Sequence, residues 1–487
     1  MKHQRFKRFA DTSAAAALVF LASCTSIERA REAQARLEPL GAGEVGQASE
    51  RLVLRGASLE ELVSFALTNR PAMASARLAV EDARLRLKEI ASDAPIVSST
   101  PWNALDASAT IGHSEQSKSA HFDQLKSQTH GSASGTLSLG LLLWDFGRNS
   151  ARAKSACEGV VAAEMDLLEQ GYSVFEEVAS AWFALLQNDT LLEVAFADEQ
   201  NYAEHLRQAE DMLEIGEAQE LDVLRARLDL AKAREAVVAA SNDVAIAGAR
   251  MMSALGVDAS RGTCDEVLGH REVDFEKFRA SFAETDASSE SVFALARTNT
   301  PTMAAVRAKL RAASSDVDYA VRDMYPEISA TLSLNWTDPL WYWRWGFSGV
   351  QSLFSGFKTT VAIDRSLVAL ETAANAVLAQ EQDLSRDIEV AVAERDNSRE
   401  AYASAEVSVA SAKENLSTVS GRYTVGEASR VDYTDAAADY TDALGARVKA
   451  FYRGQIAESK MFRLTGAMPE YVGVEENKQP ETQGAGE

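Results

Sequence analysis

Two long stretches of this sequence contain no proline, and they limit what the chain can fold into more than any other feature. They cover about residues 147–213 and 358–423, hold few glycines, and are rich in Ala, Leu, Glu and Arg. This composition favours α-helix over the whole of each stretch. At ~1.5 Å per residue, a helix of about 65 residues is on the order of 100 Å long. Because no compact domain needs such a helix, the sequence predicts a coiled coil or a tube.

Each long stretch belongs to a unit that the sequence contains twice. The segments EIGEAQELDVLRA and TVGEASRVDYTDA both carry Gly-Glu-Ala, beginning at Gly216 and Gly426. Upstream, FALTNRPAMASAR from Phe65 is similar to LARTNTPTMAAVR from Leu295. A repeat of roughly 180 to 200 residues is too long for a solenoid and predicts two similar halves with pseudo-symmetry.

Both halves are predicted to contain the same elements in the same order. A helix comes first, and two segments of alternating polarity follow it. The long helix and a second helix then complete the half. The first helices are expected at about 58–92 and 289–323, and the last at about 220–255 and 430–465.

The alternating segments have the pattern of membrane strands. Ile328–Trp336 and Trp341–Phe347 alternate with period 2 around a Thr-Asp-Pro turn, and residues 107–112 and 135–143 alternate more weakly. Strands of about ten residues with one apolar face are typical of membrane β-barrels. A hairpin packed on a soluble core is the alternative. The membrane interpretation predicts an aromatic girdle of Trp336, Trp341, Trp343 and Trp345.

Four strands cannot close a barrel, and an open sheet edge is not viable in lipid. Either the strands are soluble, or several chains share one barrel. Three chains would supply twelve strands and twelve long helices.

The N-terminus has the features of a targeting segment. A basic region with Lys2, Arg5, Lys7 and Arg8 precedes a short apolar run, at about 14–22, that ends in Leu-Ala-Ser-Cys. This ending resembles the bacterial lipobox, and the resemblance implies that Cys24 becomes the first residue and carries lipid, palmitate included. A secretory signal that contains Cys by chance is the alternative. Thr25 after the Cys favours, by the same resemblance, the outer membrane.

Composition and motifs argue against several classes of function. A formal charge of −23 disfavours nucleic-acid binding, which needs Lys and Arg at phosphates. The sequence has no phosphate-binding loop and no nucleophile elbow. We therefore expect no enzyme, no cofactor and no metal. The cysteines Cys157 and Cys264 match neither a disulfide framework nor a zinc motif. The other candidate metal ligands are His113, His121 and His130, which share one polar stretch. We interpret this stretch as a solvated loop and not as a metal site.

Several local motifs resemble those of TolC-type outer-membrane efflux proteins, most closely the lipid-anchored, OprM-like branch. They are Leu143-Trp-Asp-Phe-Gly-Arg148, Leu353-Phe-Ser-Gly-Phe357, Arg422-Tyr-Thr-Val-Gly426 and Asp222-Val-Leu224. Together with the lipobox and the duplication, the resemblance covers about 58–466.

The resemblance implies a mainly α fold with a membrane β-barrel part. Four strands per chain would form a 12-stranded barrel in a homotrimer, above an α-helical periplasmic tunnel. The implied function is the exit duct of a tripartite efflux or secretion system in the outer membrane. The implied partners are outer-membrane lipid, a periplasmic adaptor (membrane fusion) protein and an inner-membrane transporter.

The same resemblance assigns a gate at the periplasmic end. Asp432 and Asp435 match two aspartates that form a ring at the pore entrance, and Asp222 and Tyr423 match members of an entrance lock. The family's basic lock partner corresponds to Ala428, so Arg422 or Arg430 would have to replace it. Asp222 and Asp432 also lie in early helical turns, where a carboxylate is favourable in itself.

The two Gly-Glu-Ala phrases are expected to form turns between paired antiparallel helices. Their glycines fit positions just past a helix end, where a left-handed φ is needed. By resemblance, these turns meet the adaptor. The predicted docking residues are Gly216, Glu217, Gly426 and Glu427.

The resulting domain prediction has six segments. They are a signal peptide (1–23), a lipid-anchored segment (24–57), a first repeat (58–256), an equatorial segment (257–286), a second repeat (287–466) and a C-terminal tail (467–487). The main rival is a lipid-anchored periplasmic coiled-coil scaffold without channel activity. An enzyme with long helices is the second.

Overall fold

The structure is a computed structural model of the chain, and it describes residues 29–32, 34, 58–92, 104–114, 130–216, 219–257, 289–337, 340–352, 354–425 and 427–466. The chain divides into two compact units, Met1–Val53 and Leu54–Glu487, and the strands and the long helices belong to the second unit. The predicted lipid-bearing Cys24, Glu217 and Gly426 lie outside the described residues, as does the side chain of Trp336. The domain limits given above stay predictions.

The two halves contain the same elements in the same order, as the repeat predicts. Each has two short helices, two strands, one helix of 67 residues and one shorter helix. The first half comprises α2 (Leu59–Asn69), α3 (Pro71–Ser92), β1 (Ala104–Ser114), β2 (His130–Trp144), α4 (Arg148–Glu214) and α5 (Glu220–Ala254). The second comprises α7 (Ser289–Asn299), α8 (Pro301–Arg322), β3 (Glu327–Thr337), β4 (Leu340–Val350), α9 (Lys358–Thr424) and α10 (Arg430–Thr465).

The first helix of each half was expected to be continuous, and this expectation is wrong. Each breaks one residue before a proline, at Arg70 and Thr300, where ψ is 129° and 127°. Proline disfavours helical dihedrals in the residue before it, because its ring collides with that residue's backbone. Pro71 and Pro301 instead begin the next helix, a position where their missing N–H costs nothing.

The repeated motif around these prolines builds a core in each half. Leu62, Ala66 and Met73 are buried in the first half, and their equivalents Val292, Ala296 and Met303 are buried in the second. The first cluster is the larger, and it includes Phe175, Val178 and Leu185 of α4, Met251 of α5, and Leu255 just after α5.

The strands form one antiparallel sheet in the order β1-β2-β3-β4, so β1 and β4 are its edges. The register places Leu332 opposite Trp345 and Leu334 opposite Trp343, which gives one apolar face. On the other face, Thr136 donates to Asn335 at 3.1 Å, and the hydroxyls of Ser329 and Ser348 lie 2.8 Å apart. The side chains of Trp341, Trp343, Trp345 and Phe347 are all more than half exposed.

The Asp-Phe-Gly-Arg motif forms the junction from β2 to α4. The buried carboxylate of Asp145 accepts hydrogen bonds from the backbone N–H groups of Gly147 (3.0 Å) and Asn149 (2.7 Å), which caps the helix. Arg148 then pairs with Glu327 at 2.6 Å, at the start of β3. The motif thus joins a strand of one half to the long helix of the other.

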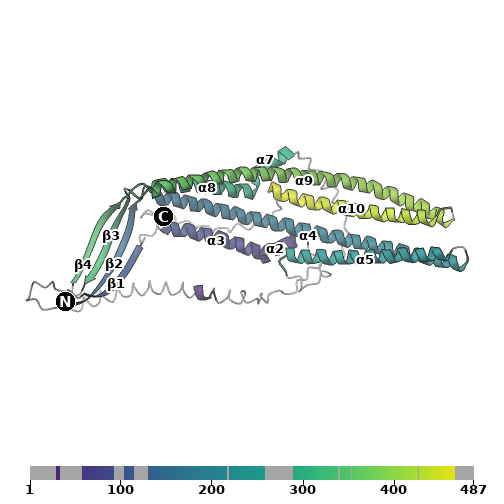
Figure 1. Ribbon diagram of the computed structural model, residues 1–487, viewed down its shortest axis with the longest axis horizontal. Coiled ribbons are helices and arrows are strands. Elements are labelled where there is room, and N and C mark those ends of the chain that lie inside the picture. The colour runs from purple at the N-terminus through teal and green to yellow at the C-terminus, as the bar shows by residue number, and fades with distance from the viewer. Residues whose placement is uncertain are drawn as a thin grey trace, which may run out of the picture. The chain divides into compact units, whose positions relative to one another are not determined.

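Figure 1 shows the sheet at one end of the long helices and the two hairpin turns at the other. Helix α4 pairs with α5 in the first hairpin, and α9 pairs with α10 in the second. Helix α4 also contacts α3, α8 and α10, so it lies at the centre of the helical part.

Candidate functional site at the hairpin ends

The first hairpin turns at a glycine with the predicted left-handed conformation. Gly216 has φ +81°, and its N–H donates to the carbonyl oxygen of Leu213 at 3.0 Å. Helix α5 then begins at Glu220. In the second hairpin, the N–H of Glu427 donates to the carbonyl oxygen of Arg422 at 2.8 Å. Backbone hydrogen bonds therefore end α4 at Gly216 and close the second turn, where the side chain of Glu427 is exposed.

The predicted ring residue Asp432 caps the helix in which it lies. Its carboxylate accepts from the hydroxyl (2.8 Å) and the N–H (3.0 Å) of Ser429, and its own N–H donates back to that hydroxyl (3.2 Å). These hydrogen bonds from Ser429 hold the pKa of Asp432 below its ordinary value. Asp222 is its equivalent and accepts from the N–H of Gln219 at 3.3 Å. Repetition of this aspartate thus has a structural cause.

Asp435 has no such role. It lies one helical turn after Asp432, and both side chains are exposed. Of the two predicted ring residues, Asp435 is therefore the one whose charge is free of helix capping.

The predicted lock residues Asp222 and Tyr423 lie near the hairpin ends, and their role in an entrance lock stays a prediction. No hydrogen bond joins Tyr423 to Asp222 within the described part of the chain. Tyr423 instead stacks on Tyr433, with ring centroids 5.4 Å apart, and both rings contact the buried His205 of α4. Burial raises the pKa of Tyr423, while the charge of Arg430 lowers it and that of Asp222 raises it by less.

An ion pair joins the two hairpins beside these rings. The guanidinium of Arg430 lies 3.3 Å from the carboxylate of Asp229 in α5, and the side chains are only 14% and 22% exposed. Arg430 is one of the two arginines that the sequence offers as a basic lock partner, and that role stays a prediction. Asp229, His205 and Tyr433 were missed, because their partners come from helices about 200 positions away.

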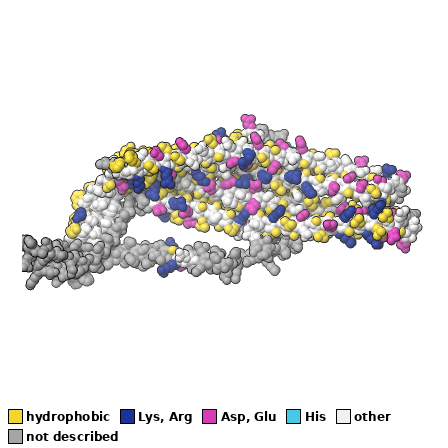
Figure 2. All heavy atoms as spheres, viewed as in Figure 1, with side chains coloured by type: hydrophobic (Ala, Val, Ile, Leu, Met, Phe, Trp, Pro, Cys, Tyr) yellow, Lys and Arg dark blue, Asp and Glu magenta, His cyan; other side chains and the backbone are white. Residues whose placement is uncertain are grey.

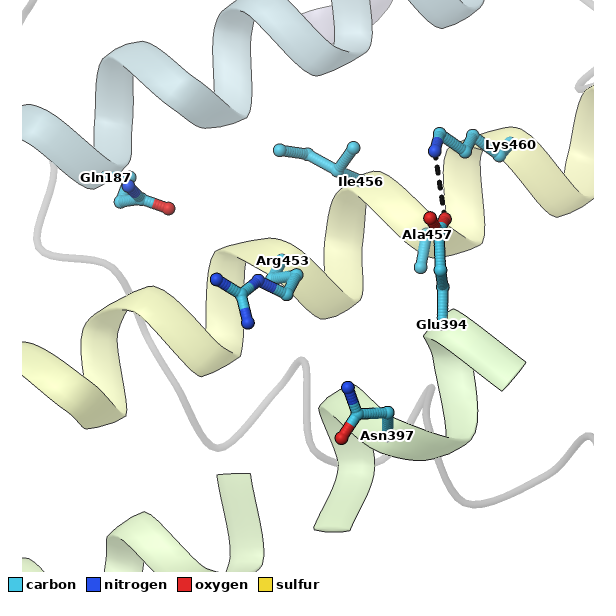
Figure 3. A pocket seen from close by; sticks show the side chains of 7 residues that line it. All are labelled: Gln187, Glu394, Asn397, Arg453, Ile456, Ala457 and Lys460. Atoms are coloured by element: carbon cyan, nitrogen blue, oxygen red, sulfur yellow. Dashed lines mark hydrogen bonds and ion pairs between the residues drawn. The ribbon is translucent and has the colours of Figure 1, made fainter. Parts of the chain in front are cut away.

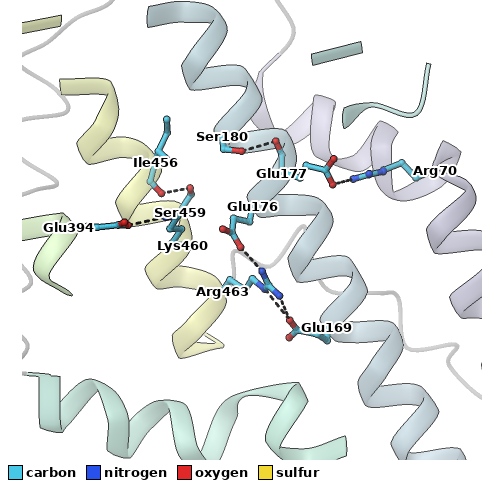
Figure 4. A network of polar contacts seen from close by, with 10 residues as sticks. All are labelled: Arg70, Glu169, Glu176, Glu177, Ser180, Glu394, Ile456, Ser459, Lys460 and Arg463. Carbon is cyan, nitrogen blue, oxygen red and sulfur yellow. Dashed lines mark hydrogen bonds and ion pairs between the residues drawn. The ribbon is translucent and has the colours of Figure 1, made fainter. Parts of the chain in front are cut away.

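Further polar contacts continue along the helices toward the sheet. Thr441 donates to Asp198 at 2.9 Å, and the hydroxyls of Thr190 and Tyr452 lie 3.5 Å apart. Figure 4 shows Arg463 between Glu169 and Glu176, with both distances 2.7 Å. Burial raises the pKa of Glu169. Helix α10 is thus tied to α4 by polar side chains over most of its length.

A cavity of about 270 Å³ lies where α4, α9 and α10 meet. Figure 3 shows its lining, in which Lys460 pairs with Glu394 at 2.9 Å near Arg453 and two amide side chains. The residues form no nucleophile–base arrangement. Within the described ranges, no group of three or more His, Cys, Asp or Glu side chains is arranged to hold a metal ion.

The sheet differs from the helices in charge. The four strands contain only Asp106, Glu327 and Arg344 as charged residues, and Figure 2 shows the other charged side chains spread over the helical part. None of the described helices has the length and apolar character needed to cross a membrane.

Three solved structures with the same fold are outer-membrane proteins. The outer-membrane channel OprN is 20% identical, with a TM-score of 0.70 over 85% of this chain and 91% of that one. VceC from Vibrio cholerae is 16% identical, with a TM-score of 0.68 over 84% and 96%. The Campylobacter jejuni channel CmeC is 16% identical, with a TM-score of 0.70 over 87% and 90%. No curated protein sequence matches the chain.

The family model for outer membrane efflux proteins matches residues 62–257 and 292–467, which is most of the chain. The matched residues include both hairpins and the whole sheet. The chain therefore belongs to the TolC-type outer membrane efflux protein family, and it is an outer-membrane efflux channel.

Proposed function

We propose that three copies of the chain form the exit duct of a tripartite efflux system, with the hairpin ends as its periplasmic entrance. The observation that carries this proposal is the four-stranded sheet with an apolar face, exposed Trp side chains and two unpaired edges. Neighbouring copies would pair β1 with β4 and so close a barrel of twelve strands, which removes the edges that lipid does not tolerate. Trp341, Trp343 and Trp345 would then face lipid as an aromatic girdle.

The proposed cation-selective ring consists of Asp435 and Asp432 from each copy. Three copies would bring six carboxylates around one axis, where they attract cations. Because Asp432 also caps α10, Asp435→Asn is the cleaner substitution. In single-channel recordings in a planar bilayer, we expect Asp435→Asn to lower cation selectivity and to weaken block by divalent ions several-fold.

The matched control for this experiment is Glu414→Gln, since Glu414 is exposed on α9, away from the turn. It should leave selectivity and block unchanged. Equal effects of the two substitutions, or none from Asp435→Asn, would place the ring elsewhere. Verified trimers that never conduct, as the wild type or with the Arg430–Asp229 pair disrupted, would favour the periplasmic coiled-coil scaffold without channel activity.

We also propose that the pair Arg430–Asp229 holds the entrance closed, together with Asp222 and Tyr423. Arg430→Asp or Asp229→Arg alone replaces attraction by repulsion at a half-buried site. Each should shift the equilibrium toward the open entrance by about 1 kcal/mol per copy, which is about fivefold. The double exchange should restore the wild-type open probability in the same recordings. A double variant as open as the single ones would contradict the pairing.

The adaptor protein is proposed to bind the turns at Gly216, Glu217, Gly426 and Glu427. Since the turn at Glu427 closes through its backbone, its side chain can be replaced without loss of the turn. A photo-crosslinking residue at position 427 should capture a periplasmic adaptor in cells. The same residue at position 414, exposed on α9 away from the turn, should not. Adaptor capture at 414 alone would refute this docking site.

Lipid at Cys24 completes the proposal, because an acyl anchor would hold the N-terminus at the membrane. Mass spectrometry of the mature protein should find a lipidated N-terminal Cys24, and Cys24→Ala should abolish palmitate incorporation. An unmodified N-terminus would show an ordinary secretory signal instead.

A further inference from the structure

The four strands contain a single Lys or Arg, and it lies on the polar face of the sheet. In β4 the odd-numbered residues from Trp341 to Phe347 form the apolar face, so Arg344 lies on the other one. The register places Arg344 opposite Ser333 and its same-face neighbour Tyr342 opposite Asn335. Both side chains therefore belong to polar rows of the sheet.

The guanidinium of Arg344 contacts an aromatic ring rather than an acid. Its central carbon lies 5.9 Å from the centroid of the Tyr342 ring, two residues away along the strand. Such a cation–π contact restricts the guanidinium without neutralising its charge. Among the described residues no carboxylate forms an ion pair with Arg344, and Glu327 of the same sheet pairs with Arg148. Arg344 therefore carries an unneutralised positive charge on an exposed side chain.

The position of Arg344 along the strand decides which side of a barrel it can face. It is the fifth of the 11 residues of β4, so it lies near the middle of the strand's length. An Arg that faces lipid at that depth is strongly destabilising, whereas positions that face the lumen tolerate charge. The exposed rings of Trp343 and Trp345, on either side of it, occupy the apolar face. In the proposed barrel Arg344 therefore faces the lumen.

We infer that three Arg344 side chains, one from each copy, form a ring in the barrel lumen that binds and concentrates anions. The ring presupposes the proposed trimeric duct. Twelve strands spaced ~4.8 Å apart and tilted by about 40° give a barrel with a radius of roughly 12 Å. Guanidinium groups on that wall would lie roughly 6 to 8 Å from the axis. Rings of Arg or Lys in a pore favour anions, including the phosphate groups of solutes.

The one acidic residue in this row of the sheet lies on the far edge strand. Asp106 of β1 shares the row with Arg344 through Ser138 and Ser333. Within one chain, three strand spacings of together roughly 14 Å separate the two positions. Between copies, the stagger that closes a twelve-stranded barrel displaces the row by about four to six residues. Arg344 of one copy therefore does not meet Asp106 of the next.

Coulomb's law gives the size of the effect. Three such charges in water, with a Debye length of ~10 Å at about 0.1 M salt, raise the anion concentration on the axis by about fivefold. At about 1 M salt the Debye length falls to ~3 Å, and the increase falls below about twofold. The proposed Asp435 ring lies near the hairpin turns, at the other end of the long helices (Figure 1). The two rings act independently, because on the order of 100 Å separates them.

The first test is ion selectivity in planar bilayers. Reversal potentials of full-length trimers in a KCl gradient give the ratio of anion to cation permeability. At about 0.1 M salt we expect Arg344→Gln to lower this ratio about fivefold, and Arg344→Lys to keep it. At about 1 M salt the wild type and Arg344→Gln should converge, which a change in pore shape alone would not produce. The change is opposite in sign to that expected for Asp435→Asn.

The second test needs no current, so it also applies to a duct whose entrance is closed. Arg344→Cys and Trp343→Cys are made separately in protein without Cys157 and Cys264, and the trimers are placed in lipid vesicles. A charged thiol reagent that does not cross membranes should modify position 344, and mass spectrometry should find position 343 unmodified. Trp343 is the matched control, because it is the adjacent exposed residue on the opposite face.

The outcomes separate the ring from the duct. Conducting trimers with the same selectivity in the wild type and in Arg344→Gln would overturn the ring and leave the duct in place. A position 344 that stays unmodified, or modification at 343 instead, would also overturn the ring, because Arg344 would not face water. Chains that form neither trimers nor channels would remove the proposed duct, and the ring with it.

Discussion

The structure depends on one uninterrupted helix. Helix α4 runs for 67 residues without a proline, and an interior proline would cost about 3 kcal/mol or more and kink it. Along this length it packs against α3, α5, α8 and α10, and its start is tied to the strand of the other half through Arg148. The sheet, the first core and the hairpin contacts are therefore all positioned by this one helix. A kink in it would displace the turns relative to the sheet by more than any local repacking could correct.

The two halves use the same plan with different chemistry. At the strand-to-helix junction the first half has the buried Asp145 cap, and the second has only a hydroxyl pair, Ser355 and Thr359, 3.1 Å apart. At the hairpin turns the relation is reversed, since Ser429 caps α10 with its side chain and Gln219 begins α5 with a weaker arrangement. The first half also holds the larger apolar cluster. Its hairpin is therefore anchored by apolar packing against α2 and α3.

Local sequence patterns determine much of the fold, and for that reason it could be predicted from the sequence. Three patterns act within a few residues: the absence of proline, the period-2 alternation and the repeated Gly-Glu-Ala phrase. The long helices, the strands and the turn at Gly216 lie where these patterns predict them. Pro71 and Pro301 also act locally, and the helix breaks that they cause at the preceding residue could have been predicted in the same way. The site was less predictable. Asp432 could be placed near a helix start, yet its capping role needs Ser429 in the right rotamer, and the partners of His205 and Arg430 are fixed only by how two hairpins lie together.

The contacts between the hairpins have a further consequence. Toward the turns, from Arg430 to Thr441, hydroxyls, carboxylates, a guanidinium and aromatic rings meet. Further along α10, Val448, Phe451 and Tyr452 form an apolar cluster with Phe183, Leu186 and Leu191 of α4. Water can solvate the polar groups toward the turns once they part, so separation of the hairpin ends exposes little surface that would adhere to another protein. An aliphatic seam of the same length would hold more firmly but would aggregate or fail to reclose after each opening. The polar contacts near the hairpin ends thus favour repeated separation and reclosure over the tightest possible contact.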